Sequence, residues 1–481
     1  MTNYKKFISN TVVYGLAAVL PRVITFILTA VFTVALNTTH FSHQTNWFIY
    51  AAFINVVLSM GMETTFFRFY TSEENKDSII SNAVCIILIN TVIFGLIGFV
   101  FGDYFTGISG FDDSIIIKIL ILTTILDAWV IIPFALIRVT QRPWKFMIIK
   151  VLNTLVYFIL TCLFLLFLPK IQIDFNLSSY FHTGYKPGIF HIIFANFVAS
   201  TITLVLLLSE FRSISWKFDK ITAQKMLEYG IPIMIAGFAY IINENYDKLY
   251  ISKVLGDDLN GIYSASYRLG VFMTLYIMAF RLGAEPFFFN VSKDLDAKLK
   301  YKTVMHWFIV LGTILMLGVV VFIDIIAAIL LRQDIYKQGL MIVPIILLAN
   351  LFSGIYLNLS IWYKLTNKTV FGMFISIFGA FLTIITLMFF VPRLGYIGGA
   401  YATLFTYGAM AIISYVLSRK FFPVPYNVIG AVGFIALASI FSFISFYIFR
   451  GQLLINILIL VLYILIVYLV EGRKLRELAQ K

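Results

Sequence analysis

Residues 78–101 read SIISNAVCIILINTVIFGLIGFVF, a run that contains no charged side chain. A bilayer core about 30 Å thick needs roughly 20 apolar residues per helical crossing. About fourteen such runs follow one another along the chain, with short polar breaks between them. A membrane barrel is excluded, because its strands alternate apolar and polar residues over about ten positions. The sequence therefore predicts an all-α polytopic membrane protein with about 14 transmembrane helices.

The composition agrees with a membrane protein, since 61% of the 481 residues are hydrophobic and 12% are charged. The longest predicted loops, 170–186 and 211–226, are too short for a catalytic domain, so we expect no enzyme. There is no Walker-type phosphate loop, which argues against ATP hydrolysis. The five histidines lack metal-ligand spacing, and both cysteines fall inside predicted spans. We therefore expect no metal site, no cofactor and no disulfide framework.

The net charge of +13 is compatible with nucleic acid binding or with a membrane protein. The positions of the basic residues along the chain distinguish these two explanations. In the fourteen-span topology, about 23 lysines and arginines fall on one side and about 7 on the other. This is the positive-inside bias, and it predicts that both termini lie in the cytoplasm. Topology explains the charge, so no nucleic acid partner is expected. No removable signal peptide is predicted, since no small-residue cleavage site follows a compact apolar stretch.

Internal repeats predict two lobes. The stretch 138–142 (RVTQR) matches 364–368 (KLTNK) type for type, and Glu63 and Glu285 end corresponding helices. Tyr14-Gly15 and Tyr229-Gly230 open another corresponding pair of helices. Chance similarity in apolar sequence is the alternative, but three matches in the same order favour two pseudo-symmetric six-helix lobes around a central cavity. The predicted organisation is an N-terminal lobe (1–210), a cytoplasmic linker (211–227), a C-terminal lobe (228–418) and two further helices with a tail (419–481).

Ionisable side chains deep in a span usually face a wet or protein-lined interior. Arg22 lies halfway along the first span, directly after Pro21, which can bend the helix there. An anion-binding role is favoured over a purely structural ion pair. Asp127 lies near the middle of the fourth span and needs a partner, for which Arg22 is the candidate. Lys150 is expected to reach the membrane surface from near a span end.

The densest polar cluster of any span is 243–248 (NENYDK) in the seventh run, where positions four apart share a face. The alternative is a helix that ends early, with Asp247 and Lys248 near the outer surface. The eighth run carries Arg268 and Arg281, either of which could instead reach a membrane interface. The predicted substrate-binding residues are Arg22, Asp127, Asn243, Asp247, Tyr267, Arg268 and Arg281. The predicted ion-coupling residues are Glu63, Asp127, Glu244 and Glu285.

Several stretches resemble one transporter family along essentially the whole chain. They are 61–69 (GMETTFFRF), 137–143 (IRVTQRP) and 358–365 (NLSIWYKL). These stretches and the helix pattern resemble the multidrug/oligosaccharidyl-lipid/polysaccharide (MOP) flippase superfamily, specifically its Wzx-type polysaccharide and O-antigen flippases. The family's cationic cavity residue on the first helix corresponds to Arg22, in the context Arg22-Val23-Ile24-Thr25-Phe26.

The resemblance implies a bacterial inner-membrane flippase for lipopolysaccharide or polysaccharide biosynthesis. Its substrate would be an undecaprenyl-pyrophosphate-linked oligosaccharide, moved from the cytoplasmic to the outer leaflet by alternating access. Membrane lipids, a polysaccharide polymerase and chain-length machinery are the partners that this implies. Two alternatives remain: a multidrug exporter of the same superfamily and a membrane-embedded polysaccharide polymerase or ligase.

Overall fold

The computed structural model describes residues 2–72, 75–102, 104, 106, 111, 114–171, 188–212, 214–292, 294–366 and 368–479. For residues 2–12, 72, 170–171, 286 and 473–479, only the backbone is described. Over these ranges the chain is helical, without strands, and 14 helical segments are long and apolar enough to cross a membrane. The predicted all-α, fourteen-span fold is therefore confirmed. The predicted loop 170–186 lies outside the described residues except for the backbone of 170 and 171.

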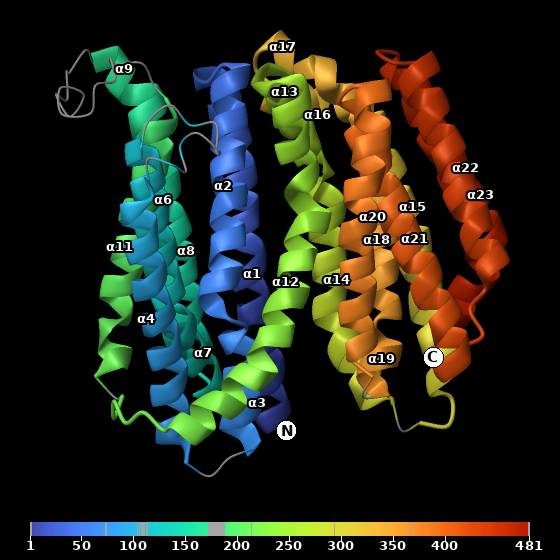
Figure 1. Ribbon diagram of the computed structural model, residues 1–481. Coiled ribbons are helices and arrows are strands. Elements are labelled where there is room, and N and C mark those ends of the chain that lie inside the picture. Colours follow the sequence, from blue (N-terminus) through green and yellow to red (C-terminus); the bar gives the residue numbers. More distant parts are fainter. Residues whose placement is uncertain are drawn as a thin grey trace. The chain divides into compact units, whose positions relative to one another are not determined.

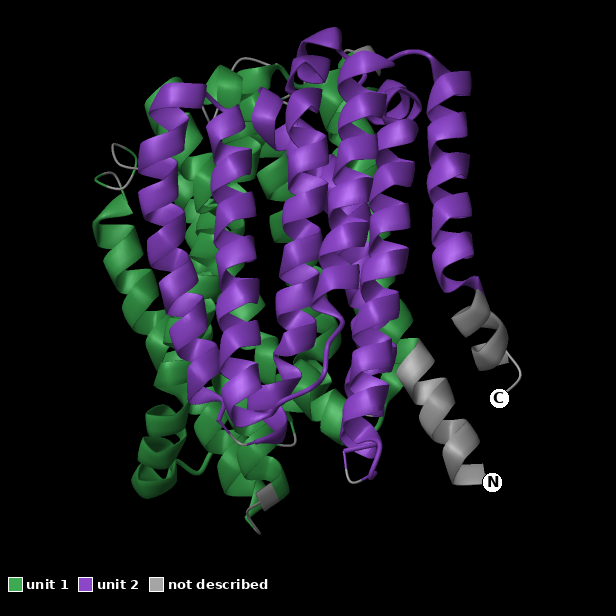
Figure 2. Ribbon diagram, turned by 90° about the vertical axis from the view of Figure 1, so that its right-hand side faces the viewer, with its two compact units in different colours: residues 1–261 green, residues 262–481 purple. Residues whose placement is uncertain are grey.

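The chain divides into two compact units, Met1–Gly261 and Ile262–Lys481 (Figure 2). The first unit holds α1 (Thr2–Ala35), α2 (Thr38–Ser59), α3 (Met62–Ser72), α4 (Lys76–Val100), α6 (Ser114–Trp129), α7 (Ile131–Val139), α8 (Pro143–Cys162), the π-helix η1 (Leu163–Phe167), α9 (Leu168–Ile171), α11 (Ile189–Phe211), α12 (Lys220–Leu255) and the start of α13 (Asp257–Tyr267). Figure 1 labels the helices in chain order. The predicted lobe boundaries at 210 and 228 stay predictions, although α12 begins at Lys220 rather than at residue 228.

The second unit contains the remaining described helices. They are η2 (Arg268–Gly270), α14 (Val271–Asn290), α15 (Ala297–Val321), α16 (Ile323–Leu330), α17 (Asp334–Lys337), η3 (Gln338–Ile342), α18 (Val343–Leu359), α19 (Ile361–Leu365), α20 (Val370–Leu394), α21 (Ile397–Phe421), α22 (Val428–Phe443), the π-helix η4 (Ile444–Ile448) and α23 (Leu453–Ala479). Within this unit, α18, α20 and α21 pack closely together, and α15 packs against α22.

Several spans are broken helices. The second span consists of α2 and α3, which meet at Met60 and Gly61, both with left-handed backbone at φ 46° and 68°. Glycine adopts this conformation without a steric penalty. A side chain at position 61 would also place its Cβ 2.4 Å from the carbonyl oxygen of Gly230 in α12. Glycine at position 61 therefore allows both the bend and the close approach of α12.

The turns after α7 and α19 share their hydrogen bonds, as the sequence repeat predicts. Thr140 Oγ1 donates to the Leu136 carbonyl at 2.7 Å, and Thr366 Oγ1 donates to the Trp362 carbonyl at 2.8 Å. The amide of Arg142 donates five residues back in the chain, and so does the amide of Lys368. Corresponding residues thus make corresponding bonds, which supports a structural repeat over chance similarity.

Asp219 caps the first turn of α12, and this cap should respond to pH. Its carboxylate accepts from the Thr222 hydroxyl and from the amides of Ile221 and Thr222, which lower the pKa of this carboxyl below its ordinary value of 3.8. The cap therefore stabilises the helix above pH 3.8 and is lost as the pH falls through the lowered pKa. We expect exchange protection of the Ile221 and Thr222 amides to fall there, after correction for intrinsic rates.

The control is Asp219→Asn, because asparagine caps helices without titrating. Protection of the same two amides should then be independent of pH in this range. An unchanged pH dependence in the asparagine variant would assign the effect to another group.

Candidate functional site

Arg22 lies in the middle of α1, one residue after Pro21. The Thr25 hydroxyl donates to the Pro21 carbonyl at 2.9 Å and the Arg22 carbonyl at 3.1 Å. The Arg22 side chain is exposed and has no hydrogen bond or ion pair within the described parts of the chain. The expected pairing of Arg22 with Asp127 is therefore wrong. An arginine without a carboxylate is suited to meet an anion.

Asp127 has different partners. Its carboxylate accepts a hydrogen bond of 2.6 Å from Ser200 of α11, and Asn55 of α2 also donates to it. Lys150 of α8 attracts it electrostatically, and the Lys150 ammonium lies 4.4 Å from the centre of the Phe134 ring. The expectation that Lys150 reaches the membrane surface is wrong, because this lysine turns toward Asp127 inside the unit. Its cost of burial is offset by the carboxylate and the aromatic face.

Glu63 and Arg138 form a second acid–base pair, with 2.6 Å between Glu63 Oε1 and Arg138 Nη1. The Arg138 guanidinium also lies 4.6 Å from the centre of the Phe67 ring. Lys150 interacts electrostatically with Glu63 as well as with Asp127. Two acids and two bases thus form one cluster from α3, α6, α7 and α8. We call Glu63, Asp127, Arg138 and Lys150 the four-charge cluster.

Among the described residues, the second unit has a counterpart of the Glu63–Arg138 pair but none of Asp127 with Lys150. Lys364 bonds Glu285, and these two residues correspond in the repeat to Arg138 and Glu63. Arg281 lies 3.5 Å from the other oxygen of Glu285. The offset that relates Arg138 to Lys364 places serines, Ser353 and Ser376, where the first unit has Asp127 and Lys150. The electrostatic interaction of Asp127 with Lys150 therefore has no counterpart in the described part of the second unit.

The polar stretch of α12 lies well inside a helix that continues to Leu255. Asn243, Asp247 and Lys248 are 5%, 3% and 5% exposed. Lys248 bonds the Asp247 carboxylate at 2.9 Å and the Glu244 carbonyl at 3.1 Å. The alternative in which the helix ends early is therefore wrong. A buried ion pair of neighbouring residues fills this position.

The other predicted binding residues lie in the second unit. Tyr267 packs against Tyr263, with 5.8 Å between ring centres. Arg268 is half-buried in a short 3-10 turn, and Arg281 is exposed beside Glu285. Their roles in binding stay predictions. Among the predicted residues of the first unit, the structure brings Glu63 and Asp127 together through Lys150 and leaves Arg22 without an ionic partner in the described chain.

Sequence reasoning missed Glu210, whose side chain is almost fully buried near the end of α11. Arg142 holds it with two hydrogen bonds, of 2.9 and 2.7 Å, and Lys145 adds one of 2.6 Å. The sequence did contain a signal for this contact. Glu210 is a lone acid at the end of one predicted span, and Arg142 and Lys145 are two bases at the start of another. This cluster fixes α11 to the start of α8, and its charges are satisfied within the protein.

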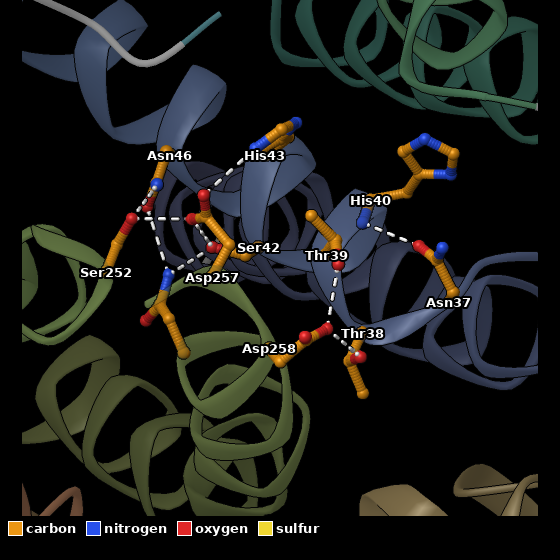
Figure 3. A network of polar contacts seen from close by, with 11 residues as sticks. Asn37, Thr38, Thr39, His40, Ser42, His43, Asn46, Ser252, Asp257 and Asp258 are labelled. Atoms are coloured by element: carbon orange, nitrogen blue, oxygen red, sulfur yellow. Dashed lines mark hydrogen bonds and ion pairs between the residues drawn. The ribbon is translucent and has the colours of Figure 1, made fainter. Parts of the chain in front are cut away.

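A second missed feature is a polar network between the start of α2 and the α12–α13 junction (Figure 3). Asp257 accepts from Ser42 and Ser252, each at 2.6 Å, and its other oxygen lies 3.1 Å from His43 Nε2. Asp258 accepts from both Thr38 and Thr39. We call this network the α2–α13 clasp, and its members are Thr38, Thr39, Ser42, His43, Asn46, Ser252, Asp257, Asp258 and Asn260. Hydroxyl groups of α2 and of Ser252, together with His43, bond the two carboxylates. The clasp therefore joins α2 to the α12–α13 junction.

Comparisons with known proteins identify the fold. No known family model matches the chain. An uncharacterized membrane protein of Methanocaldococcus jannaschii is 25% identical over 181 residues, which span 38% of this chain and 42% of that protein. The solved structure of the lipid II flippase MurJ, in an inward closed conformation, is similar with a TM-score of 0.74 and 15% identity. It matches over 96% of this chain and 100% of that one.

An inward-facing multidrug resistance MATE family transporter of the MOP superfamily is similar with a TM-score of 0.64 and 12% identity. That match covers 85% of this chain and 97% of the transporter. The chain has the fold of a MOP-type transporter. The similar structures are thus a lipid II flippase and multidrug transporters. The fold fits a multi-pass membrane protein.

The four-charge cluster yields a stability prediction. Lys150→Met removes the positive charge that interacts electrostatically with the Asp127 carboxylate, and we expect it to destabilise the protein by about 1–3 kcal/mol. The double variant Asp127→Asn with Lys150→Met removes both charges and should recover much of the loss. Thermal unfolding in detergent measures both. Two losses that simply add would show that the residues do not interact.

The α2–α13 clasp yields a second prediction. Gly261 approaches α2 so closely that an added Cβ would lie 2.0 Å from the Thr38 carbonyl oxygen. Gly261→Ala should therefore destabilise the protein by about 1–3 kcal/mol through overpacking. The matched control is Gly318→Ala in α15, where nothing lies within 4 Å of the added atom. Equal melting temperatures for the two variants would contradict the close contact.

Proposed function

We propose that this chain is a flippase for a lipid-linked oligosaccharide with a pyrophosphate group. In this proposal the oligosaccharide is a polysaccharide repeat unit on undecaprenyl pyrophosphate, which moves from the cytoplasmic to the outer leaflet of a bacterial inner membrane. Both termini would lie in the cytoplasm. The observation that carries the proposal is Arg22, a mid-span guanidinium with no ionic partner in the described chain.

The chemistry of Arg22 suits a pyrophosphate. A guanidinium stays charged at all physiological pH values and can donate two parallel hydrogen bonds to phosphate oxygens. Keeping such a group in the middle of an apolar helix costs several kcal/mol on insertion scales, which a structural role without a partner would not offset. An anionic headgroup that passes along α1 would provide the missing charge, while the lipid tail remains in the bilayer.

The acid–base pairs suit a role in coupling. Glu63, Asp127 and Glu285, which we proposed for ion coupling, each lie beside a lysine or arginine. A change of protonation or of ion occupancy at such a pair would alter the packing of the helices that carry it. We propose that these pairs rearrange during alternating access. Asn243, Glu244, Asp247, Tyr267, Arg268 and Arg281 complete the proposed set of binding and coupling residues.

A multidrug exporter is the second candidate, since MATE transporters are among the similar structures. An exporter of cationic drugs would need carboxylates that are available to the drug. Here Glu63 bonds Arg138, Asp247 bonds Lys248 and Glu285 bonds Lys364, so these carboxylates are already neutralised. This arrangement favours an anionic substrate.

The test replaces Arg22 by alanine in cells that lack the native gene. We expect surface polysaccharide to fall at least tenfold, because the proposed phosphate contact is lost, while the amount of protein in the membrane stays unchanged. Arg22→Lys is the matched control and should retain partial activity, since it keeps the charge but loses the paired hydrogen bonds. Full surface polysaccharide with Arg22→Ala would refute the assignment.

A further inference from the structure

The segment between α11 and α12 exposes large apolar side chains. Trp216, Phe218 and Ile221 have exposed fractions of 52%, 53% and 69%. Trp216 lies five positions after Phe211, the last residue of a helix that is long and apolar enough to cross a membrane. The segment therefore lies near the level at which a bilayer changes from hydrocarbon to headgroups. Aromatic residues, tryptophan above all, are enriched at that level.

This segment is held firmly to the first unit. Ile214 is buried in an apolar cluster with residues of α4 and α12, and the Ser215 hydroxyl lies 2.9 Å from that of Ser81. The amide of Asp219 donates to Asn82 Oδ1 at 3.0 Å. In Figure 1 the first turns of α12 run obliquely past the ends of α4 and α3 before α12 turns along the bundle. The exposed side chains are thus displayed on a fixed scaffold.

The backbone conformation at Trp216 indicates that the exposed position of its side chain is held in place. Its φ is +54°, a left-handed conformation that is unusual for a bulky residue. Such a conformation persists only where surrounding contacts enforce it. The contacts of Ile214, Ser215 and Asp219 on either side do so here. The chain therefore keeps a strained backbone and an exposed indole together.

The charge around these apolar side chains is positive. Lys217, Lys220 and Lys225 are exposed and form no ion pair with the described residues. Of the acids in this stretch, Asp219 caps α12 with both carboxylate oxygens, and Glu228 accepts a hydrogen bond from Gln224. Three exposed lysines thus lie within nine residues of Trp216, in the same stretch as the exposed apolar side chains. We call Trp216, Lys217, Phe218, Lys220, Ile221 and Lys225 the interfacial patch.

We propose that the interfacial patch binds anionic phospholipid headgroups in the leaflet at this end of the bundle. The indole and its apolar neighbours enter the headgroup region, and the lysines meet lipid phosphates. Basic residues next to a membrane span are attracted to anionic lipid, and an exposed apolar group adds to this attraction. An acidic soluble protein is the competing occupant, and the experiment distinguishes the two. The patch is independent of the substrate proposed above.

The position of Trp216 is tested with full-length protein in nanodiscs. Wild type and Trp216→Phe are compared in phosphatidylcholine with 30% phosphatidylglycerol, in both cases with and without bromine on the acyl chains near the headgroup. The fluorescence difference between the two proteins isolates the Trp216 signal. We expect brominated lipid to quench it at least twofold and aqueous iodide to quench it little. Strong iodide quenching without lipid quenching would place the indole in water and overturn the proposal.

The lysines are tested by counting bound phosphatidylglycerol with native mass spectrometry. The variant Lys217→Gln, Lys220→Gln, Lys225→Gln should retain about half as much of this lipid as the wild type, or less. The matched control is Lys298→Gln, Lys300→Gln, Lys302→Gln, which removes the same charge from a basic segment in which Lys300 is paired with Asp294 and Asp296. Equal lipid retention by the two variants would overturn the proposal, as would retention unchanged from wild type in the first.

Discussion

The lack of water in the bilayer core constrains every polar group of this protein. Backbone groups must bond within helices, and a charge inside a span needs a partner of opposite sign or a polar environment. The described chain meets this constraint by pairing neighbouring acids and bases. Glu63 with Arg138, Asp247 with Lys248 and Glu285 with Lys364 are examples from different helices. Within the described chain, Arg22 departs from this pattern, because it is exposed in mid-span without an ionic partner, and this calls for a functional explanation.

The acid–base pairs also show how far the two halves of the chain remain alike. The pair between the start of α3 and the end of α7 has its counterpart between the last part of α14 and the end of α19, and the turns after α7 and α19 share their hydrogen bonds. The pair Asp127–Lys150 is replaced by serines at the corresponding positions of the second half. The Glu63–Arg138 pair thus belongs to the architecture that both halves share. In the described chain, the interaction of Asp127 with Lys150 is specific to the first unit, which makes it the better candidate for a coupling role.

Much of the fold follows from the sequence, because apolar length alone sets where a helix can cross a membrane. The repeat was also predictable, since 138–142 and 364–368 match in residue type and spacing and form the same turn. Side-chain partners were harder to predict. Lys150 lies two turns into α8, where sequence position alone cannot distinguish a lysine that reaches the surface from one that turns inward. Its direction depends on Asp127 and Phe134, which come from other helices.

The missed contacts have a similar explanation. Glu210 and its two cations are distant in sequence, and their meeting depends on how α8 and α11 pack. The carboxylates of Asp257 and Asp258 look like ordinary acids at a helix start, and only the fold brings the hydroxyls of α2 to them. Local pattern therefore predicts helices and repeats, whereas contacts between helices require the packed structure.

The central claim is that Arg22 serves an anionic lipid headgroup, and binding of a defined lipid tests it most directly. Native mass spectrometry of the purified protein would compare undecaprenyl pyrophosphate with undecaprenol, which has the same tail and no phosphate. We predict retention of the pyrophosphate lipid by the wild type, at least tenfold weaker retention by Arg22→Ala, and little retention of undecaprenol by either. Equal retention of both lipids, or retention unaffected by the loss of Arg22, would contradict the claim.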